Sequence, residues 1–153
     1  MAFNNNPYAS GYNAYKEVGV KTASQGKLVV MLYEGAINNL EKALALLDEN
    51  NKIQAKNIEQ FGIYIQKATN IISELQCSLN LDQGGEIAKN LLSLYIFFNK
   101  QLLDSTLDHD RKKIESVCNM MKELAESWRV AANSTANTQI KQPMQTVSVS
   151  IEG

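Results

Sequence analysis

Apolar residues recur at steps of three and four along four stretches of the chain, a spacing that predicts four amphipathic helices. The pattern is most regular in the second stretch, where the apolar positions are Ile58, Phe61, Ile65, Ala68, Ile72, Leu75 and Leu79. Segments rich in Asn, Asp and Gly separate the stretches. We expect helices over about residues 24–48, 52–79 and 86–107, and a fourth from 108 or 110 to about 132.

The connections between these helices are short, which makes consecutive helices antiparallel neighbours. Pro7 and Pro143 both lie outside the helical stretches, so no proline interrupts a helix. The sequence therefore predicts an all-α fold, an antiparallel up-down four-helix bundle over residues 24–132. We expect residues 1–23 to form an irregular N-terminal docking segment and residues 133–153 a polar, mobile C-terminal tail.

The third stretch carries more apolar residues than one bundle interior requires. An inner face holds Ile87, Leu91, Leu94 and Phe98, and a second face, nearly opposite, holds Leu92, Ile96, Leu103 and Leu107. Other apolar residues flank the main faces of the first two helices: Tyr33, Ile37, Tyr64 and Ile71. Exposed apolar patches usually mark binding sites, so we expect this second face and the flanking residues to line a groove for a partner polypeptide. The alternative is that the chain's own ends or a second copy cover them.

Catalytic and metal-binding residues are sparse. Cys77 and Cys118 are the two cysteines of the sequence, and they lie far apart, without a Cys-x-x-Cys pair or nearby histidines, so no disulfide framework or zinc site is indicated. The single histidine, His109, is predicted in a turn and cannot supply the repeated Glu-x-x-His ligands of a di-iron bundle. Phosphate-binding loops, haem motifs and nucleophile elbows do not occur in the sequence. We therefore expect no enzymatic activity, no cofactor and no metal.

Composition and charge narrow the class of partner. Hydrophobic residues make up 44% of the chain and the net charge is −1, so no strong field favours nucleic acid. The longest strongly apolar run, residues 91–98, is too short to span a bilayer, and the first residues lack the features of a secretory signal. We expect a cytoplasmic protein that binds polypeptide by apolar contact, without nucleic acid and without direct membrane insertion.

Two other functions fit a four-helix bundle. A histidine phosphotransfer module needs an exposed histidine partway along a helix, and His109 is predicted in a turn, which disfavours that function. A self-associating structural bundle would bury the second face of the third helix against another copy and would make the protein a homodimer.

Two blocks of residues, together with a late tryptophan, match a known pattern. They comprise Tyr15, residues 22–24, 27–28, 31–36, 71–75, 78–80, 84–88, 90–91 and 94–95, and Trp128. In this order, over about residues 8–130, the sequence resembles the flagellin-specific export chaperones of the FliS family. The match is more specific than any single motif, because many positions agree in sequence order.

The resemblance implies a cytoplasmic helical bundle that binds the disordered C-terminal region of flagellin and prevents its premature polymerisation. It also implies delivery of flagellin to the cytoplasmic domain of the flagellar type III export gate through N-terminal aromatic residues. Tyr8 is the first candidate for docking at the gate, followed by Tyr12 and Tyr15. The surplus apolar residues would then form the flagellin groove.

Overall fold

The computed structural model describes residues 25–138, and within this range it confirms the predicted all-α class. The helices are α2 (Gln25–Leu44), η2 (Ala55–Asn57), α3 (Ile58–Cys77), α4 (Leu81–Asp108) and α5 (Arg111–Thr138). The expected N-terminal docking segment with Tyr8, Tyr12 and Tyr15, and residues 139–153 of the expected tail, lie outside the described residues.

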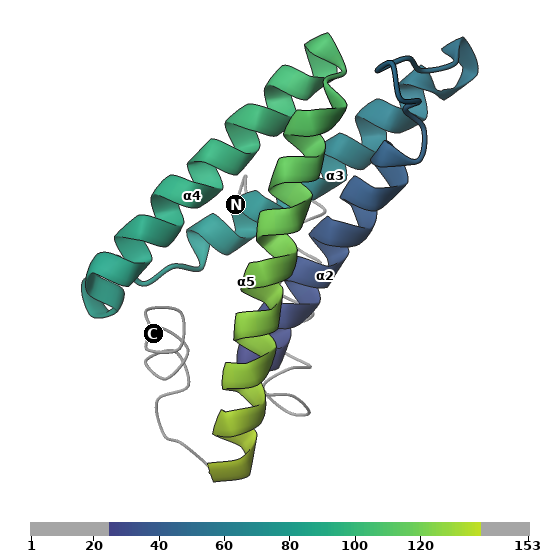
Figure 1. The fold of residues 1–153 in the computed structure, drawn as a ribbon. Helices are drawn as coiled ribbons and strands as arrows, with labels where there is room; N and C mark the ends of the chain where they lie inside the picture. The colour runs from purple at the N-terminus through teal and green to yellow at the C-terminus, as the bar shows by residue number, and fades with distance from the viewer. Residues whose placement is uncertain (1–24, 139–153) are drawn as a thin grey trace, which may run out of the picture.

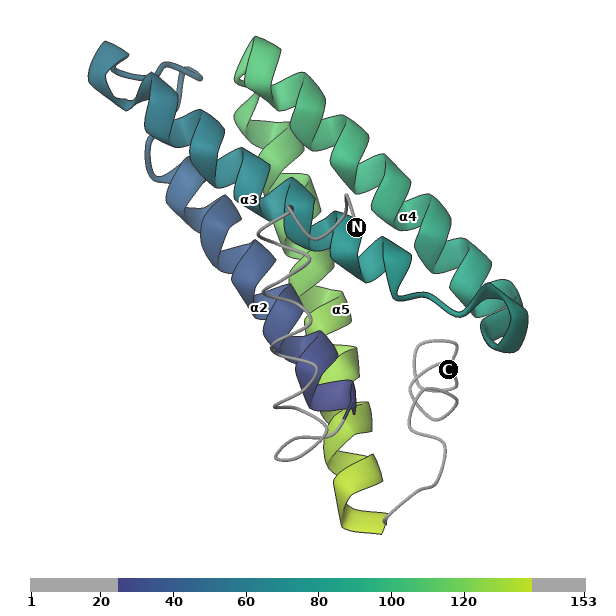
Figure 2. The same ribbon diagram turned by 180° about the vertical axis from the view of Figure 1, so that it is seen from behind.

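The four long helices form an antiparallel bundle (Figures 1 and 2). α2 packs between α3 and α5, and α4 packs between the same two helices on the other side of the bundle. α2 has the most extensive packing and α4 the least. The other helices thus cover α4 least, and α4 is also the helix that carries the surplus apolar residues.

The connection between α2 and α3 is longer than the periodicity suggested. The Asp48 carboxylate accepts hydrogen bonds from backbone N–H groups two and four residues later, at 2.8 and 3.0 Å, and such local bonds compete with helix continuation. Asn51 adopts a left-handed conformation with φ of 62°. In the structure α2 ends at Leu44 and α3 begins at Ile58, whereas the predicted helices ended near residue 48 and began near residue 52.

The expected turn at residues 80–85 is partly helical, because α4 already begins at Leu81. Asn80 caps this helix, and its side-chain oxygen accepts a hydrogen bond from the backbone N–H of Gln83 at 3.0 Å. Gly85 has φ of 57° and ψ of −137°, a conformation that is readily available only to glycine. It kinks α4 after the first turn.

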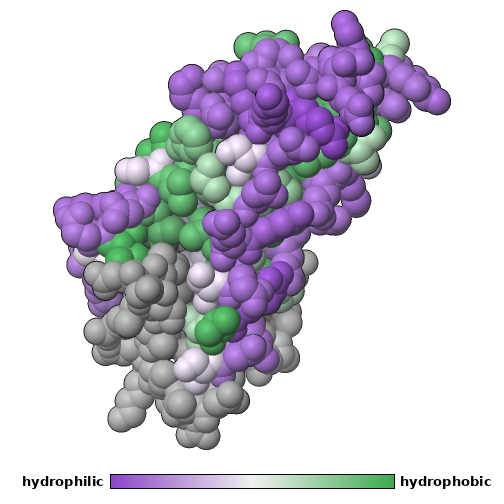
Figure 3. Space-filling model, viewed as in Figure 1, coloured by the Kyte–Doolittle hydropathy of each residue, from purple (hydrophilic) through white to green (hydrophobic). Residues whose placement is uncertain are grey.

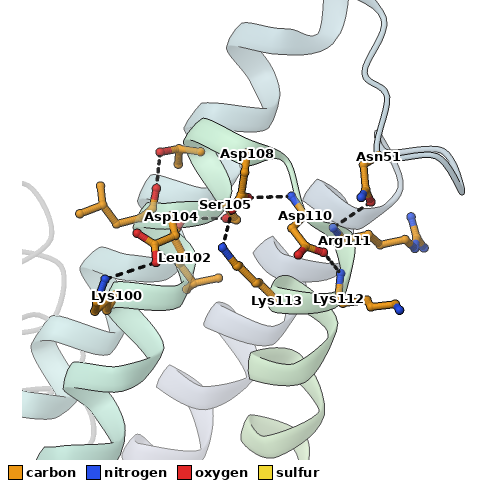
Figure 4. A network of polar contacts seen from close by, with 12 residues as sticks. Asn51, Lys100, Leu102, Asp104, Ser105, Asp108, Asp110, Arg111, Lys112 and Lys113 are labelled. Carbon is orange, nitrogen blue, oxygen red and sulfur yellow. Dashed lines mark hydrogen bonds and ion pairs between the residues drawn. The ribbon is translucent and has the colours of Figure 1, made fainter.

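A polar network joins the turn between α4 and α5 to the loop after α2 (Figure 4). His109 ends α4 with φ of 53°, in the turn where it was predicted. The backbone N–H of Arg111 donates to Oδ1 of Asn51 at 3.0 Å. Nη1 of Arg111 donates to the carbonyl oxygens of Leu44 and Leu47 at 3.0 and 2.9 Å. These bonds tie the turn before α5 to the carbonyl groups of Leu44, the last residue of α2, and of Leu47 in the loop that follows.

An ion pair closes the same turn. Nζ of Lys113 donates to the carboxylate of Asp108. This hydrogen bond lowers the pKa of Asp108 and raises the pKa of Lys113. Both side chains reach solvent, where ion pairs contribute little to stability, so the pair mainly fixes the local geometry of the turn.

α5 continues to Thr138, past the end predicted near residue 132. No glycine or proline occurs between Trp128 and Pro143, so nothing in the sequence breaks the helix immediately after residue 132. The first residues assigned to the polar tail therefore belong to α5.

The interior of the bundle is built from one buried face of each helix, and it largely follows the predicted periodicity. The buried side chains include Leu32, Ala36, Leu40, Phe61, Ile65, Ile72, Leu91, Phe98, Leu102, Ile114, Val117 and Met121. The bundle thus has a single hydrophobic core to which all four long helices contribute.

Three aromatic residues meet inside this core. The hydroxyl groups of Tyr33 on α2 and Tyr95 on α4 share a hydrogen bond, with 2.5 Å between the oxygens. The indole of Trp128 on α5 lies with its ring centre 6.3 Å from that of Tyr33. Burial raises the pKa of Tyr33 to about 12 and also raises the pKa of Tyr95, so both hydroxyls stay protonated at neutral pH.

Candidate partner-binding site

A groove of about 640 Å³ lies between α3 and α4. Its lining residues are Glu59, Gly62, Ile63, Ile65, Gln66 and Thr69 from α3, and Asn99, Leu103 and Thr106 from α4. Ile63 and Leu103 are 39% and 63% exposed, so each helix contributes an apolar side chain that water reaches. Most of the other lining side chains are polar. The groove therefore offers apolar contacts together with hydrogen-bonding groups.

Asn99 links the two helices that form the groove. Its Nδ2 donates to Oγ of Ser73 on α3 at 3.1 Å. Its Oδ1 is buried and has no hydrogen-bond partner among the described residues, an arrangement that costs free energy.

The second apolar face predicted for the third helix forms a stripe along α4, beside this groove. We call it the α4 stripe, and its members are Leu92, Ile96, Leu103 and Leu107. Leu92 is half-buried, whereas Ile96, Leu103 and Leu107 are 53%, 63% and 82% exposed. Apolar side chains thus stay in contact with water along the C-terminal half of the helix.

The α4 stripe adjoins the buried face of α4, although the sequence placed it nearly opposite. Burial centres on Tyr95 and Leu102, while Leu94 and Ile87 from the predicted inner face are only partly buried. The actual inner face is therefore rotated toward the stripe. This rotation brings Leu103 into the groove beside α3.

The other flank of α4 is apolar as well, on the side toward α5. Figure 3 shows hydrophobic side chains gathered between α4 and α5. Phe97 is 43% exposed, and Leu94, Met120 and Leu124 pack against the edge of the core. Sequence reasoning missed Phe97, although a run of five apolar residues at 94–98 requires that some of them face outward.

Two residues expected in the groove belong instead to the core. Tyr33 is fully buried and Ile37 is 8% exposed. Tyr33 can be buried because its hydroxyl is satisfied by Tyr95, a partner from a distant helix that periodicity does not reveal. The structure therefore corrects the placement of both residues.

Tyr64 and Ile71 lie away from the α4 stripe, at the junction of α2 and α3. Nζ of Lys42 on α2 lies 5.8 Å from the centre of the Tyr64 ring. Gly35 on α2 has no side chain, so the end of the Ile71 side chain lies close against α2 at this position. Both residues are half-buried, so they flank a helix junction rather than the groove between α3 and α4.

The position of His109 does not meet the requirement of a phosphotransfer module. This residue caps the end of α4, and its ring packs edge-on against Phe61 with 5.4 Å between ring centres.

Among the described residues, no cluster of His, Cys, Asp and Glu could hold a metal ion. Cys77 is exposed and Cys118 is buried, and burial raises the pKa of Cys118.

The helices of the described range show no membrane-spanning character, because none combines the length and the apolarity that a bilayer requires. The exposed apolar residues of α4 alternate with charged ones such as Lys89, Lys100 and Asp104. This mixed surface suits contact with another polypeptide.

Comparison with known proteins establishes the family. Residues 8–135 match the family model for flagellar protein FliS. The chain belongs to the FliS family. The flagellar secretion chaperone FliS of Escherichia coli (strain K12) is 34% identical over 126 residues, which cover 79% of this chain and 88% of that protein. FliS of Salmonella typhimurium is 36% identical over 126 residues, with coverage of 79% and 89%. FliS of Campylobacter jejuni is 32% identical over 123 residues, with coverage of 80% and 91%.

FliS membership confirms the resemblance seen in the sequence and makes this chain a member of a family of flagellar export chaperones. The relatives carry the name of a chaperone and not of an enzyme. For this member of the family, the structure identifies a candidate binding surface, which consists of the α4 stripe and the groove between α3 and α4.

Proposed function

We propose that this FliS-family chain binds the disordered C-terminal region of flagellin in the cytoplasm and prevents its premature polymerisation. It then delivers flagellin to the cytoplasmic domain of the flagellar type III export gate. The observation that carries the proposal is the α4 stripe beside the groove between α3 and α4, in a chain whose relatives are flagellar secretion chaperones.

The chemistry of this surface suits a chain that folds as it binds. Each exposed apolar side chain of the stripe gains about 25 cal/mol for every Å² that a client removes from water. The client loses conformational entropy when it becomes ordered, which offsets part of this gain. Binding is therefore moderate and reversible, and release at the gate needs no nucleotide hydrolysis by the chaperone.

The groove also supplies polar groups for the client. An extended segment carries free backbone N–H groups, and Asn99 holds an oxygen that lacks a partner among the described residues. Gln66 and Thr69 offer further hydrogen-bonding groups along the same groove. In this arrangement the stripe contributes affinity and the polar groups fix the register of the client.

The triple variant Leu92→Gln/Ile96→Gln/Leu103→Gln is expected to bind a peptide from the C-terminal region of flagellin about 100-fold more weakly. Each substitution removes roughly 1 kcal/mol of apolar contact, and tenfold in affinity corresponds to about 1.4 kcal/mol. Isothermal titration calorimetry measures the affinity, and circular dichroism checks that the helical content is unchanged.

The matched control is Met31→Gln/Val130→Gln, which alters apolar residues that are 41% and 58% exposed on α2 and α5. Its affinity for the peptide should stay within about twofold of the wild type. An unchanged affinity in the triple variant, with normal binding in the control, would exclude the α4 stripe from the flagellin site.

Docking at the export gate is proposed to use Tyr8, with Tyr12 and Tyr15 as weaker candidates. Tyr8→Ala is expected to leave flagellin affinity within about twofold while reducing recovery of the chaperone–flagellin complex on the immobilised gate domain by at least about tenfold. A pull-down with purified components measures this. Equal loss of flagellin binding would show that Tyr8 serves the client site and not the gate.

A further inference from the structure

We propose that residues 147–151 of this chain pack against the apolar surface between α4 and α5, on the other side of α4 from the groove. We call this surface the α4–α5 flank, and its members are Leu94, Phe97, Met120 and Leu124. The inference concerns a contact of the chain with its own C-terminal segment, and it does not rest on the function proposed above.

The α4–α5 flank is the most open junction between neighbouring long helices. The two helices are joined at the turn after Asp108 and diverge toward the far end of the bundle (Figures 1 and 2). Their packing is the least extensive among the neighbouring pairs. The Phe97 side chain is 43% exposed, and the other members of the flank are only partly buried. One aromatic and three other apolar side chains therefore share a surface that the described helices do not fully cover.

The surroundings of the flank suit an uncharged occupant. Polar residues without charge lie one helical turn from its members: Asn90 and Gln101 on α4, and Ser116 and Ser127 on α5. Two charged residues, Lys100 and Glu123, border the flank and are exposed, so they can remain in water when the flank is covered. Residues 144–151 carry no charge either. This segment can therefore cover the flank without burying an unpaired charge.

The C-terminal segment has an apolar pattern that fits such a surface. Its apolar and polar residues alternate in the order Val147, Ser148, Val149, Ser150 and Ile151. Successive side chains of an extended chain point to opposite faces, so the three apolar residues would share one face and the serines the other. β-Branched residues favour an extended conformation, and Pro143 disfavours a helix that would run from α5 into this segment.

The segment also starts at a suitable place and is long enough. α5 ends at Thr138, at the end of the bundle where α4 and α5 lie apart (Figure 1). Leu124 and Met120 lie about 21 and 27 Å back along α5, at about 1.5 Å per residue. An extended chain advances about 3.3 Å per residue, so Val147 can lie up to about 30 Å from Thr138. Val147 therefore reaches the level of Leu124, and Ile151 can pass that of Met120.

The covalent link favours this occupant over others. A short linker holds a segment at an effective concentration on the order of 1 mM, so a contact too weak for two separate molecules can still form within one. A second copy would lack this advantage. The N-terminal segment is less suitable, because it leads into α2, which packs on α3 and α5 but not, at any described position, on α4.

The contact would give the two sides of α4 different roles. The C-terminal segment closes the side toward α5, whereas the α4 stripe and the groove toward α3 stay accessible to a partner. The family match ends at residue 135. The proposed cover therefore comes from a segment beyond the part of the chain on which the family assignment rests.

Methyl NMR of the full-length chain tests the contact. The chain is isotope-labelled at its methionine methyl groups, and a nitroxide is attached to Glu152→Cys. A Cys77→Ser background removes the exposed thiol, and Cys118 is buried. Met120 reports on the flank, and Met31, 41% exposed on α2, is the control. Because the nitroxide broadens only nearby signals, the Met120 signal is expected to disappear and the Met31 signal to remain. A Met120 signal that survives would overturn the proposal.

Two matched variants test which face of the segment makes the contact. Val147→Asp/Val149→Asp should restore the Met120 signal, because two carboxylates would otherwise be buried against the flank. Ser148→Asp/Ser150→Asp adds the same charge at the alternate positions and should leave the signal lost. Recovery of the signal in both variants, or in neither, would contradict a contact through the apolar face.

A mixed sample tests whether the contact lies within one chain. Nitroxide-labelled chain without isotope is mixed with an equal amount of isotope-labelled chain without nitroxide. The Met120 signal should persist in this mixture. Its loss would place the segment on a second copy and overturn the contact within one chain. These measurements use no flagellin peptide, so their failure is distinguishable from a failure of the proposed chaperone function.

Discussion

Trp128→Ala is expected to lower the free energy of unfolding by about 3–5 kcal/mol, the usual cost of removing a large aromatic side chain from a core. Trp128 is 2% exposed and packs against the Tyr33 ring, so its removal takes away buried apolar contacts and leaves a cavity that the surroundings fill only in part. A domain of this size is stable by about 5–15 kcal/mol, and the loss is therefore a large part of the total. We expect the unfolding midpoint to fall by about 10–20 °C.

Urea unfolding followed by circular dichroism measures the loss without relying on tryptophan fluorescence. Val130→Ala is the matched control, since it shortens a side chain on the same helix that is 58% exposed. The control should change stability by less than about 0.5 kcal/mol. A loss below about 1 kcal/mol for Trp128→Ala would show that the junction of α2, α4 and α5 is not the centre of the core.

Periodicity predicted the core positions where a helix has one dominant apolar face. Ala36, Leu40, Ile65 and Ile72 are fully buried, as their spacing indicated. The helix ends were harder to predict, because they depend on single polar groups. The Asp48 carboxylate holds the loop after α2 by accepting from the backbone N–H groups of Asn50 and Lys52, and the same residue type is common on exposed helix surfaces.

The candidate site was predicted in part. The α4 stripe was found from the sequence because α4 carries more apolar residues than its buried face can use. Tyr33 was misplaced because its burial depends on Tyr95, a residue 62 positions away in the sequence. Asn99 was not recognised as part of a groove, since nothing in the local sequence indicates that Ser73 of another helix lies beside it.

The hydrogen bond between Tyr33 and Tyr95 crosses the diagonal of the bundle. α2 and α4 do not come close enough for backbone contact at any described position, so side chains alone join them. Such a buried polar pair fixes the relative position of two helices only when both partners are present. If the hydrogen bond joins the two helices, the stability effects of removing either hydroxyl must depend on each other.

Tyr95→Phe and Tyr33→Phe are each expected to lower the free energy of unfolding by about 1–3 kcal/mol, because each leaves one buried hydroxyl without its partner. The double variant should lose clearly less than the sum of the two, since no unpaired hydroxyl remains. Urea unfolding of all four proteins gives the coupling energy, which we expect to be at least about 1 kcal/mol. Tyr64→Phe, at a half-buried site, serves as a control and should change stability by less than about 0.5 kcal/mol. Additive losses in the double variant would mean that the two hydroxyls do not depend on each other, and that packing alone holds α4 in register with α2.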